Sequence, residues 1–545
     1  MKQRYRPANR SQHPAFTGRG TEDEAVTEEL DRANPTNESL DGMGAGIPEG
    51  DEELAGADVG LLRRAIAPAW GRKLPLAGRA AHVAVAPEYQ ATTAQACGLY
   101  PFLAGSGSPT VGVPMGRHLL FGEVFSYDPI GWLVEGLTTN PGCFLLGQPG
   151  CGKSSFVKRL IRGMAGYGVT PWVLGDLKPD YTAVVRALGG TVIRVGRGLD
   201  TMNPLDTGPL GQAAQALGAT AREQLRAEIR GRRLNALLAL LSLVREHRIS
   251  NGEENVLGAI LDILDDKLRG KTGPVGQPTV PDVLAVLRSD AQTDRLITAA
   301  DVRTEDELVR ETKELKQTLN LLCEGSLKGA FDGPTSQPID LNAPAVSIDI
   351  SQVASAGDTI VAAAMLSTWA YAFSSIDGAN ALAEAGLAPR RQFVTVLDEM
   401  WKALRGCAGL VEYADALTRV NRAKGLADVR ATHSLGDLEA LKTAEDVAKA
   451  RGFVERAGVV VLGALSPREL REVARVVPLT DAEMDLVSGW SAPDSWIPGS
   501  RHPGRGKYLL KAGNRVGIPF ELEYVGNEAE LYNTDFRMLD PRLRR

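Results

Sequence analysis

The sequence predicts an α/β protein with a doubly wound, mostly parallel β-sheet. Three observations carry this prediction. An apolar run leads into a glycine-rich loop at 147–155, a second apolar run ends in Asp398 and Glu399, and strand and helix patterns alternate around both. Strands buried on both faces read as continuous apolar runs, so we expect both motifs to end central strands of one sheet.

The loop at 147–155 has the pattern G-x-x-x-x-G-K-S, which is typical of a phosphate-binding loop. Its glycines let backbone N–H groups turn inward, and the following helix adds its dipole. Lys153 is expected to contact the β- and γ-phosphates of ATP, and Ser154 to bind Mg²⁺. A chance match in a glycine-rich chain is the alternative. The residues expected to bind nucleotide are Gly147, Gln148, Pro149, Gly150, Cys151, Gly152, Lys153, Ser154 and Ser155.

The second motif is the run of strand formers from Gln392 to Leu397, which ends in two carboxylates. At the carboxyl edge of a parallel sheet, Asp398 is expected to hold Mg²⁺. Glu399 points to the other side of the chain and is expected to polarise the attacking water. An Asp-Glu pair can also simply close a strand, so this prediction depends on the upstream loop.

Length and composition limit the classes of protein that this chain can belong to. The chain has 545 residues and a net charge of −6, which excludes the strongly basic footprint of a constitutive nucleic-acid binder, so any DNA contact must be local. No signal-peptide core and no run of eighteen apolar residues is found, and we expect a cytoplasmic protein. The cysteines are odd in number and lack metal-ligand spacing, which indicates a reducing compartment: Cys97, Cys143, Cys151, Cys323 and Cys407.

The strand patterns follow the chain in order. Short candidates at 80–86 and 110–114 precede the phosphate loop. Apolar runs at 171–176, 191–196, 345–351, 392–398 and 458–463, and one ending at 431–434, predict further strands, and 506–511 with 515–524 predicts a hairpin. One of these strands is expected between the two phosphate motifs. Asp176, Lys178 and Asp180 should then lie at the same sheet edge as Glu399.

Helical patterns fill the remaining segments. Leucines at helical spacing fill much of 208–329, with a capping box from Ser250 to Glu253, and further helices are expected at 360–373, 410–424 and 467–476. An arginine cluster in the first of these regions is expected to be a solvated face unless DNA binds there: Arg226, Arg230, Arg232 and Arg233.

These differences in composition and periodicity divide the chain into six parts. Residues 1–60 have too few apolar side chains to offset the entropy of ordering and are expected to form a disordered tail, with a docking arm as the alternative. The other parts are a small N-terminal segment packing on the core (61–142), the first part of the core (143–207), a mostly α-helical insertion (208–329), the second part of the core (330–535) and a C-terminal tail (536–545).

The order of these motifs resembles a known family. From Tyr100 to Asp535 the chain carries G-Q-P-G-C-G-K-S, D-L-K-P-D-Y, N-P-L-D, G-A-F-D-G-P-T-S, V-L-D-E-M-W and T-H-S. This order is similar to that of the ATPases of conjugative type IV secretion systems, which belong to the HerA and FtsK group of hexameric P-loop motors. The resemblance implies a RecA-like P-loop core that hydrolyses ATP with Mg²⁺, a homo-hexamer, and DNA or the secretion machinery as partner at the cytoplasmic face of the membrane.

Two departures from the family pattern stand out. Members usually carry a large N-terminal domain that docks at the membrane, whereas this chain has a tail and a short segment before the core. Members also tend to have Gln after the Thr at the third strand end, where this chain has His433. We expect His433 to contact the γ-phosphate or the attacking water, and a packing histidine is the alternative.

Hydrolysis in a ring of this kind is expected to need an arginine from a neighbouring subunit, because Lys153 and Mg²⁺ cover only part of the transition-state charge. The candidates are Arg422, Arg419 and Arg505, with pairing to surface carboxylates as the alternative for each. Three functions remain open: a motor for conjugative transfer or type IV secretion, a double-stranded DNA translocase or helicase of the same group, and an ATP-dependent scaffold or switch without sustained turnover.

Overall fold

The computed structural model describes residues 107–533, with gaps at 246, 269–275, 326, 407–410, 412–413, 415–423, 437–440, 442 and 492–501. The chain divides into two units, residues 1–101 and 102–545, and every described residue belongs to the second. The predicted tails at 1–60 and 536–545 and the strand candidate at 80–86 lie outside the described residues.

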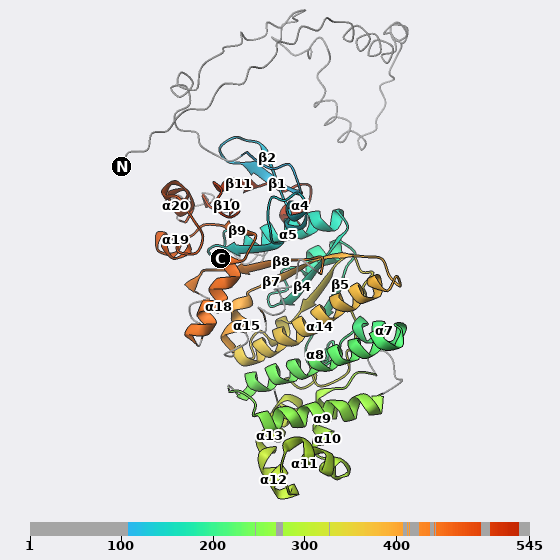
Figure 1. Ribbon diagram of the computed structural model, residues 1–545. Helices are drawn as coiled ribbons and strands as arrows, with labels where there is room; N and C mark the ends of the chain where they lie inside the picture. Colours follow the sequence, from blue (N-terminus) through green and yellow to red (C-terminus); the bar gives the residue numbers. More distant parts are fainter. Residues whose placement is uncertain are drawn as a thin grey trace, which may run out of the picture. The chain divides into compact units, whose positions relative to one another are not determined.

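One eleven-stranded sheet organises the described unit, in the order β2-β1-β11-β10-β9-β3-β8-β7-β4-β6-β5 (Figure 1). The strands from β9 to β5 pair in parallel, and β10, β11, β1 and β2 extend that sheet in antiparallel. The strands are β1 (Val113–His118), β2 (Val124–Tyr127), β3 (Gly142–Leu146), β4 (Val169–Asp176), β5 (Thr191–Arg194), β6 (Val346–Asp349), β7 (Gln392–Asp398), β8 (Leu426–Thr432), β9 (Val459–Leu462), β10 (Lys507–Lys511) and β11 (Ile518–Leu522).

Strand order confirms the predicted fold class. The strand that precedes the phosphate loop is β3, the strand that ends in Asp398 is β7, and β8 lies between them as the extra strand. In register, Leu146 of β3 stands opposite Thr432 of β8, and Asp398 of β7 stands opposite Ala431. The residues that follow these strand ends therefore meet at one edge of the sheet.

Helices cover both faces of the sheet, because successive side chains of a strand point to opposite sides. Cys143 and Leu145 of β3 belong to one apolar core, and Phe144 and Leu146 belong to the other. The helices that pack in the first core are α4 (Pro129–Val134), α5 (Lys153–Gly166) and α6 (Thr182–Ala187), with α21 (Glu528–Leu531) beside them. The helices that pack in the second core are α14 (Asp358–Glu384), α15 (Met400–Gly406), α18 (Ala444–Glu455), α19 (Pro467–Val473) and α20 (Asp481–Ser488). The short helix η4 (Ser351–Val353) precedes α14.

Between β5 and β6, every regular element in the described residues is a helix, as the leucine spacing predicts. Arg245 and Glu253 form a buried ion pair with an N···O distance of 2.7 Å, and the amide of Glu253 donates to Ser250 Oγ at 3.1 Å as the capping box requires. These helices are α7 (Pro209–Ala216), α8 (Ala219–Arg245), α9 (Asn251–Leu268), α10 (Val280–Leu287), η3 (Asp290–Gln292), α11 (Thr293–Ala300), α12 (Glu305–Glu311) and α13 (Lys313–Glu324).

Helix α14 joins the insertion to the sheet. It is 27 residues long, and among the described residues it alone is apolar enough over an 18-residue window to cross a membrane. That window is 89% buried within the protein, between β4 on one side and α7 and α8 on the other, so α14 is a core helix here. The helix is much longer than the predicted 360–373, because small residues such as Ser374, Ser375 and Gly378 continue the buried stripe.

Three of the four arginines of the α8 cluster form ion pairs with other helices instead of the predicted solvated face, whereas Arg226 is exposed as predicted. Arg233 is only 6% exposed and pairs with Asp265, while Arg230 pairs with Asp262 and Arg232 with Asp377. Carboxylates from α9 and α14, distant in sequence, neutralise these guanidinium groups. The cluster therefore joins helices to one another, which a charge count along one helix cannot reveal.

Candidate nucleotide site

The phosphate loop connects β3 to α5 and depends on glycine at two positions. Gly150 has φ 84° and Gly152 has φ 101°, values that side chains with a Cβ rarely adopt. A Cβ on Gly152 would also lie 2.8 Å from the hydroxyl of Tyr508. Two residues on the β9 and β10 side of the sheet hold the loop: the carbonyl of Ala464, just after β9, accepts from Gln148 N–H at 2.9 Å, and Tyr508 of β10 donates to the Gly152 carbonyl at 2.7 Å.

The start of α5 fits a phosphate group. Gly152, its N-cap residue, offers no side-chain cap, and the first turn of the helix contains no acidic residue. The positive end of the helix dipole and the orphan N–H groups are therefore left for an anion, with Ser154 and Ser155 half-buried in that first turn. Pro149 and Gly150 are exposed, so the loop is accessible from solvent.

Lys153 lies at the centre of the site and is 9% exposed. Its Nζ donates to the carbonyls of Gly147 (2.6 Å) and Gln148 (3.2 Å) and lies 2.8 Å from Nδ1 of His433. Burial lowers the pKa of Lys153, and the nearby Asp398 and Glu399 oppose that shift. Lys153 and His433 come from strand ends 280 residues apart in sequence, and the parallel β3–β8 pairing brings them together.

Glu399 is 6% exposed, and both of its carboxylate oxygens accept hydrogen bonds. Its Oε1 lies 2.7 Å from Lys178 Nζ and 3.0 Å from His433 Nε2, and its Oε2 accepts from Trp401 Nε1 at 2.6 Å. The residue adopts a left-handed φ of 54°, an uncommon conformation for a residue with a side chain. Lys153, His433 and Glu399 thus form a continuous chain of contacts, with the imidazole between the ammonium and the carboxylate.

Asp398 and Glu399 have opposite electrostatic environments. Burial and the neighbouring Glu399 charge raise the pKa of Asp398. Burial acts in the same direction on Glu399, but the hydrogen bonds from His433 and Lys178 and the positive charge of Lys178 outweigh it and hold the pKa of Glu399 well below its usual range. Asp398 Oδ2 accepts from the hydroxyl of Tyr181 at 2.8 Å. Among the described residues, Asp398 forms no ion pair, and a partly buried carboxylate of this kind suits a divalent metal ion, which prefers oxygen ligands.

The three candidate arginines are placed differently. Arg419 and Arg422 lie outside the described residues. Arg505 is exposed in the turn before β10, and the N–H of the next residue, Gly506, donates to the Cys151 carbonyl at 3.0 Å. Arg505 is therefore beside the phosphate loop of its own chain.

Cys151, within the phosphate loop, is 2% exposed, and burial raises the pKa of its thiol, which does not favour a reactive thiolate.

Sequence reasoning missed two contacts and one residue at this edge. The sequence places Lys178 at the edge without a partner and includes Tyr181 only as the end of D-L-K-P-D-Y, yet these side chains contact Glu399 and Asp398 respectively. Trp401, which donates to Glu399, received no role. A signal existed for all three, since Lys178 and Tyr181 directly follow β4 and Trp401 is two residues after Glu399.

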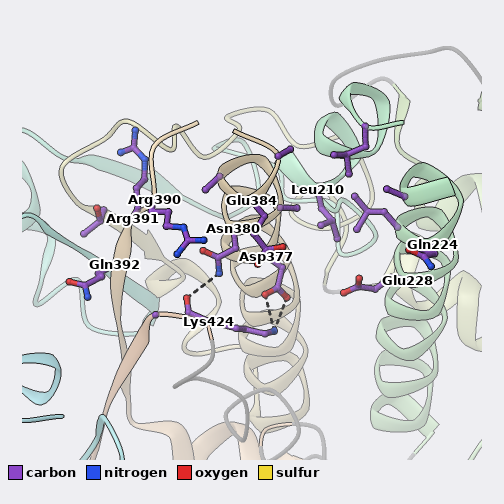
Figure 2. Close-up of a pocket in the computed structure, with 18 of the residues that line it drawn as sticks. Leu210, Gln224, Glu228, Asp377, Asn380, Glu384, Arg390, Arg391, Gln392 and Lys424 are labelled. Carbon is purple, nitrogen blue, oxygen red and sulfur yellow. Dashed lines mark hydrogen bonds and ion pairs between the residues drawn. The ribbon is translucent and has the colours of Figure 1, made fainter. Parts of the chain in front are cut away.

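A cavity of about 1160 Å³ opens at the other edge of the sheet, where β4 and β7 begin (Figure 2). Helices α8 and α14 line it together with Arg390, Arg391 and Gln392. As Figure 2 shows, Asp377 pairs with Lys424, at 2.8 Å, and Asn380 donates to the Lys424 carbonyl at 3.0 Å. None of the phosphate-motif residues lines this cavity, so it is separate from the nucleotide site.

The phosphate loop after β3, the carboxylates after β7 and the strand β8 between them define the core of a P-loop nucleoside triphosphatase fold. Among solved structures, VirB4 of Thermoanaerobacter pseudethanolicus is similar to this chain, with a TM-score of 0.57, 19% sequence identity and coverage of 78% of this chain and 100% of that one. The bacterial conjugative coupling protein TrwB gives a TM-score of 0.41 at 13% identity, over 71% of this chain and 86% of that one. The VirB4 match establishes the fold. No family model and no curated protein matches the sequence.

Proposed function

We propose that this protein is an ATP-hydrolysing motor that drives conjugative DNA transfer or the translocation of a type IV secretion substrate. We further propose that it works as a homo-hexamer in the cytoplasm, peripheral to the inner face of the membrane. Two lines of support come from the motif order, which resembles the ATPases of conjugative systems, and from a fold similar to that of VirB4. The observation that carries the proposal is the contact chain Lys153–His433–Glu399 at one sheet edge.

The chain's own residues suggest how hydrolysis would proceed. The amides of the phosphate loop and the start of α5 bind the phosphates of ATP, and Lys153 leaves the loop carbonyls to contact the β- and γ-phosphates. Bound Mg²⁺, held by Ser154 and Asp398, would neutralise charge on the transferring phosphoryl group. Glu399 has one acceptor position left on Oε2, which orients the attacking water.

His433 connects the two halves of this chemistry. With Lys153 protonated, Nδ1 of His433 accepts and its Nε2 donates to Glu399, which defines one neutral tautomer. When Lys153 turns toward a γ-phosphate, Nδ1 loses its donor. Binding of the γ-phosphate would then change the hydrogen bond between the imidazole and Glu399, as expected for a γ-phosphate sensor.

Steady-state ATPase assays with and without DNA test the proposal, with Glu399→Gln as the inactive control. DNA-stimulated turnover supports a DNA motor and leaves conjugative transfer and duplex translocation to be separated by strand-displacement assays. Turnover that is independent of DNA supports substrate secretion. Tight ATP binding without turnover would contradict the motor and support a nucleotide-dependent scaffold or switch. Electron microscopy with a non-hydrolysable ATP analogue tests the hexamer.

A further inference from the structure

One short loop, residues 177–181 between β4 and α6, contacts both carboxylates at the end of β7. Strand β4 pairs directly with β7, with Val173 opposite Val396, so this loop emerges next to Asp398 and Glu399. His433 approaches one of these carboxylates, that of Glu399, from β8 on the other side of β7. Glu399 is therefore held from both neighbouring strands, and Asp398 from the β4 side.

The carboxylate of Asp176 fixes the loop. Its Oδ1 accepts from the N–H groups of Lys178 (3.3 Å) and Asp180 (3.2 Å), and its Oδ2 accepts from that of Tyr181 at 3.0 Å. Asp176 is only 3% exposed. Three backbone donors on one buried carboxylate hold the loop in a single conformation, so its side chains leave in defined directions.

Tyr181 is directed at Asp398. The tyrosine is fully buried, and its hydroxyl is the donor of this pair because a carboxylate oxygen accepts. It donates to Oδ2 of Asp398, and the other oxygen, Oδ1, accepts the N–H of Glu399 at 3.0 Å. Each oxygen of Asp398 retains further acceptor capacity, and the plane of the carboxylate is set by these two donors.

Lys178 is directed at Glu399. Its side chain is 55% exposed, whereas that of Glu399 is 8% exposed, so the ammonium reaches inward from the loop to a buried carboxylate. Together with His433 and Trp401 it occupies three of the roughly four acceptor positions of Glu399. These donors come from three different elements, so the remaining acceptor position has a fixed direction.

We propose that the loop 177–181 assigns the two adjacent carboxylates their separate tasks: Tyr181 orients Asp398 for the metal ion, and Lys178 orients Glu399 for the attacking water. Both are positioning residues, and the inference rests on the proposed ATPase function. Removing either contact should then impair one task and spare the other, because each side chain touches only one of the carboxylates.

Two variants separate these tasks. For Tyr181→Phe, we expect the dissociation constant of Mn²⁺ for the protein–ADP complex, measured by electron paramagnetic resonance, to rise by about 10- to 100-fold. For Lys178→Met, Mn²⁺ binding should be unchanged, while kcat at saturating metal falls by on the order of 10- to 100-fold and the KM for ATP stays constant. Lys178→Arg, which keeps a cationic donor, should recover most of the lost kcat.

Matched controls exclude a general loss of stability. Tyr371→Phe removes the hydroxyl of another fully buried tyrosine, and Lys328→Met removes another half-exposed lysine with a carboxylate partner, both in or beside the helical region. Both controls should behave like the wild type. Equal Mn²⁺ affinity in Tyr181→Phe and wild type, or an unchanged or increased kcat in Lys178→Met, would overturn the inference. Failure of the wild type to bind Mn²⁺ with ADP or to hydrolyse ATP would instead overturn the proposed function itself.

Discussion

Asp398 and Glu399 are adjacent in the chain, yet their side chains meet different partners. The left-handed backbone at Glu399 turns the chain sharply at the end of β7, which separates the two carboxylates. One then meets a neutral phenol and the other meets an ammonium and an imidazole. Pairs of titratable groups whose environments push their pKa values apart are typical of sites that perform two chemical tasks.

The first prediction separates binding from hydrolysis. Lys153→Ala should weaken ATP binding, because this ammonium contacts phosphate in the ground state. Glu399→Gln should leave ATP binding unchanged and lower kcat by at least about 10²-fold, because it acts only on the attacking water. Titration with a fluorescent ATP analogue and steady-state turnover measure the two effects. Equal losses of binding in both variants would contradict this division.

A second prediction concerns the bridge made by His433. Glutamine also carries one acceptor and one donor group, so His433→Gln can accept from Lys153 and donate to Glu399, whereas His433→Ala can do neither. We expect the glutamine variant to keep most of kcat and the alanine variant to lose about 10- to 100-fold. An amide does not titrate, so the glutamine variant should also show a flatter pH profile of kcat than the wild type. Identical profiles in wild type and His433→Gln would refute the sensor role.

Asp176 links stability to pH. Burial raises its pKa from 3.8 to about 7 despite three backbone donors, so the folded state binds a proton more tightly than the unfolded chain. Its stabilising contribution is complete below about pH 4 and is lost as the pH rises through about 7, a change on the order of 4 kcal/mol. Asp176→Asn should flatten the pH dependence of the unfolding free energy in this window, as measured by urea unfolding. An unchanged slope would show that Asp176 ionises normally in the folded protein.

At the scale of elements, α14 depends on close approach to α7. Gly378 faces the start of α7, and a Cβ at this position would lie 2.3 Å from the backbone nitrogen of Leu210. The backbone cannot yield as a flexible side chain can. Gly378 therefore allows α7 and α14 to pack closely together. This close packing explains why glycine, a residue unfavourable in helices, lies within α14.

Gly378→Ala should destabilise the protein by roughly 2 kcal/mol or more, because overpacking forces the two helices apart. Gly231→Ala is the matched control. Gly231 also lies within a helix, α8, but a Cβ there would meet nothing within 4 Å. This substitution should stabilise the protein by up to about 1 kcal/mol through helix propensity. Thermal unfolding of both variants gives the comparison, and two shifts of the same sign would contradict the packing argument.

At the scale of the whole molecule, the open question is whether one chain completes its own site. The described residues bring Lys153, His433, Glu399 and Asp398 together, and Arg505 stands beside the phosphate loop of its own chain. The transition state for phosphoryl transfer carries more negative charge than Lys153 and a metal ion offset. A further arginine is therefore expected, and a ring can supply it from the neighbouring subunit.

Mixing experiments test this arrangement. If an arginine acts in trans, its alanine variant should bind ATP normally and lose about 10³-fold or more of turnover. Adding the Lys153→Ala protein should restore activity, because a mixed ring contains sites with both an intact loop and an intact arginine. We expect this complementation for at least one of Arg419, Arg422 and Arg505. No restoration for any of them, with specific activity independent of protein concentration, would show that the site is complete within one chain.

The sequence by itself determined the local parts of this protein. The strand–loop–helix around Lys153, the acidic end of β7, the capping box at Ser250 and the helical nature of the insertion all follow from patterns within a few residues or turns. Glycine at positive φ, apolar runs and helical spacing report on their immediate surroundings. For this reason the fold class and the main phosphate motifs could be predicted before any contact was known.

Only the tertiary structure decided which strands neighbour β7 and what they present to it. Placing β4 on one side and β8 on the other brings Lys178 and His433 onto Glu399, and Tyr181 onto Asp398. The pairing of the α8 arginines with α9 and α14 was decided in the same way. These contacts join residues up to hundreds of positions apart, and they depend on strand order and register, which follow from the packing of the whole core and leave no local pattern in the sequence.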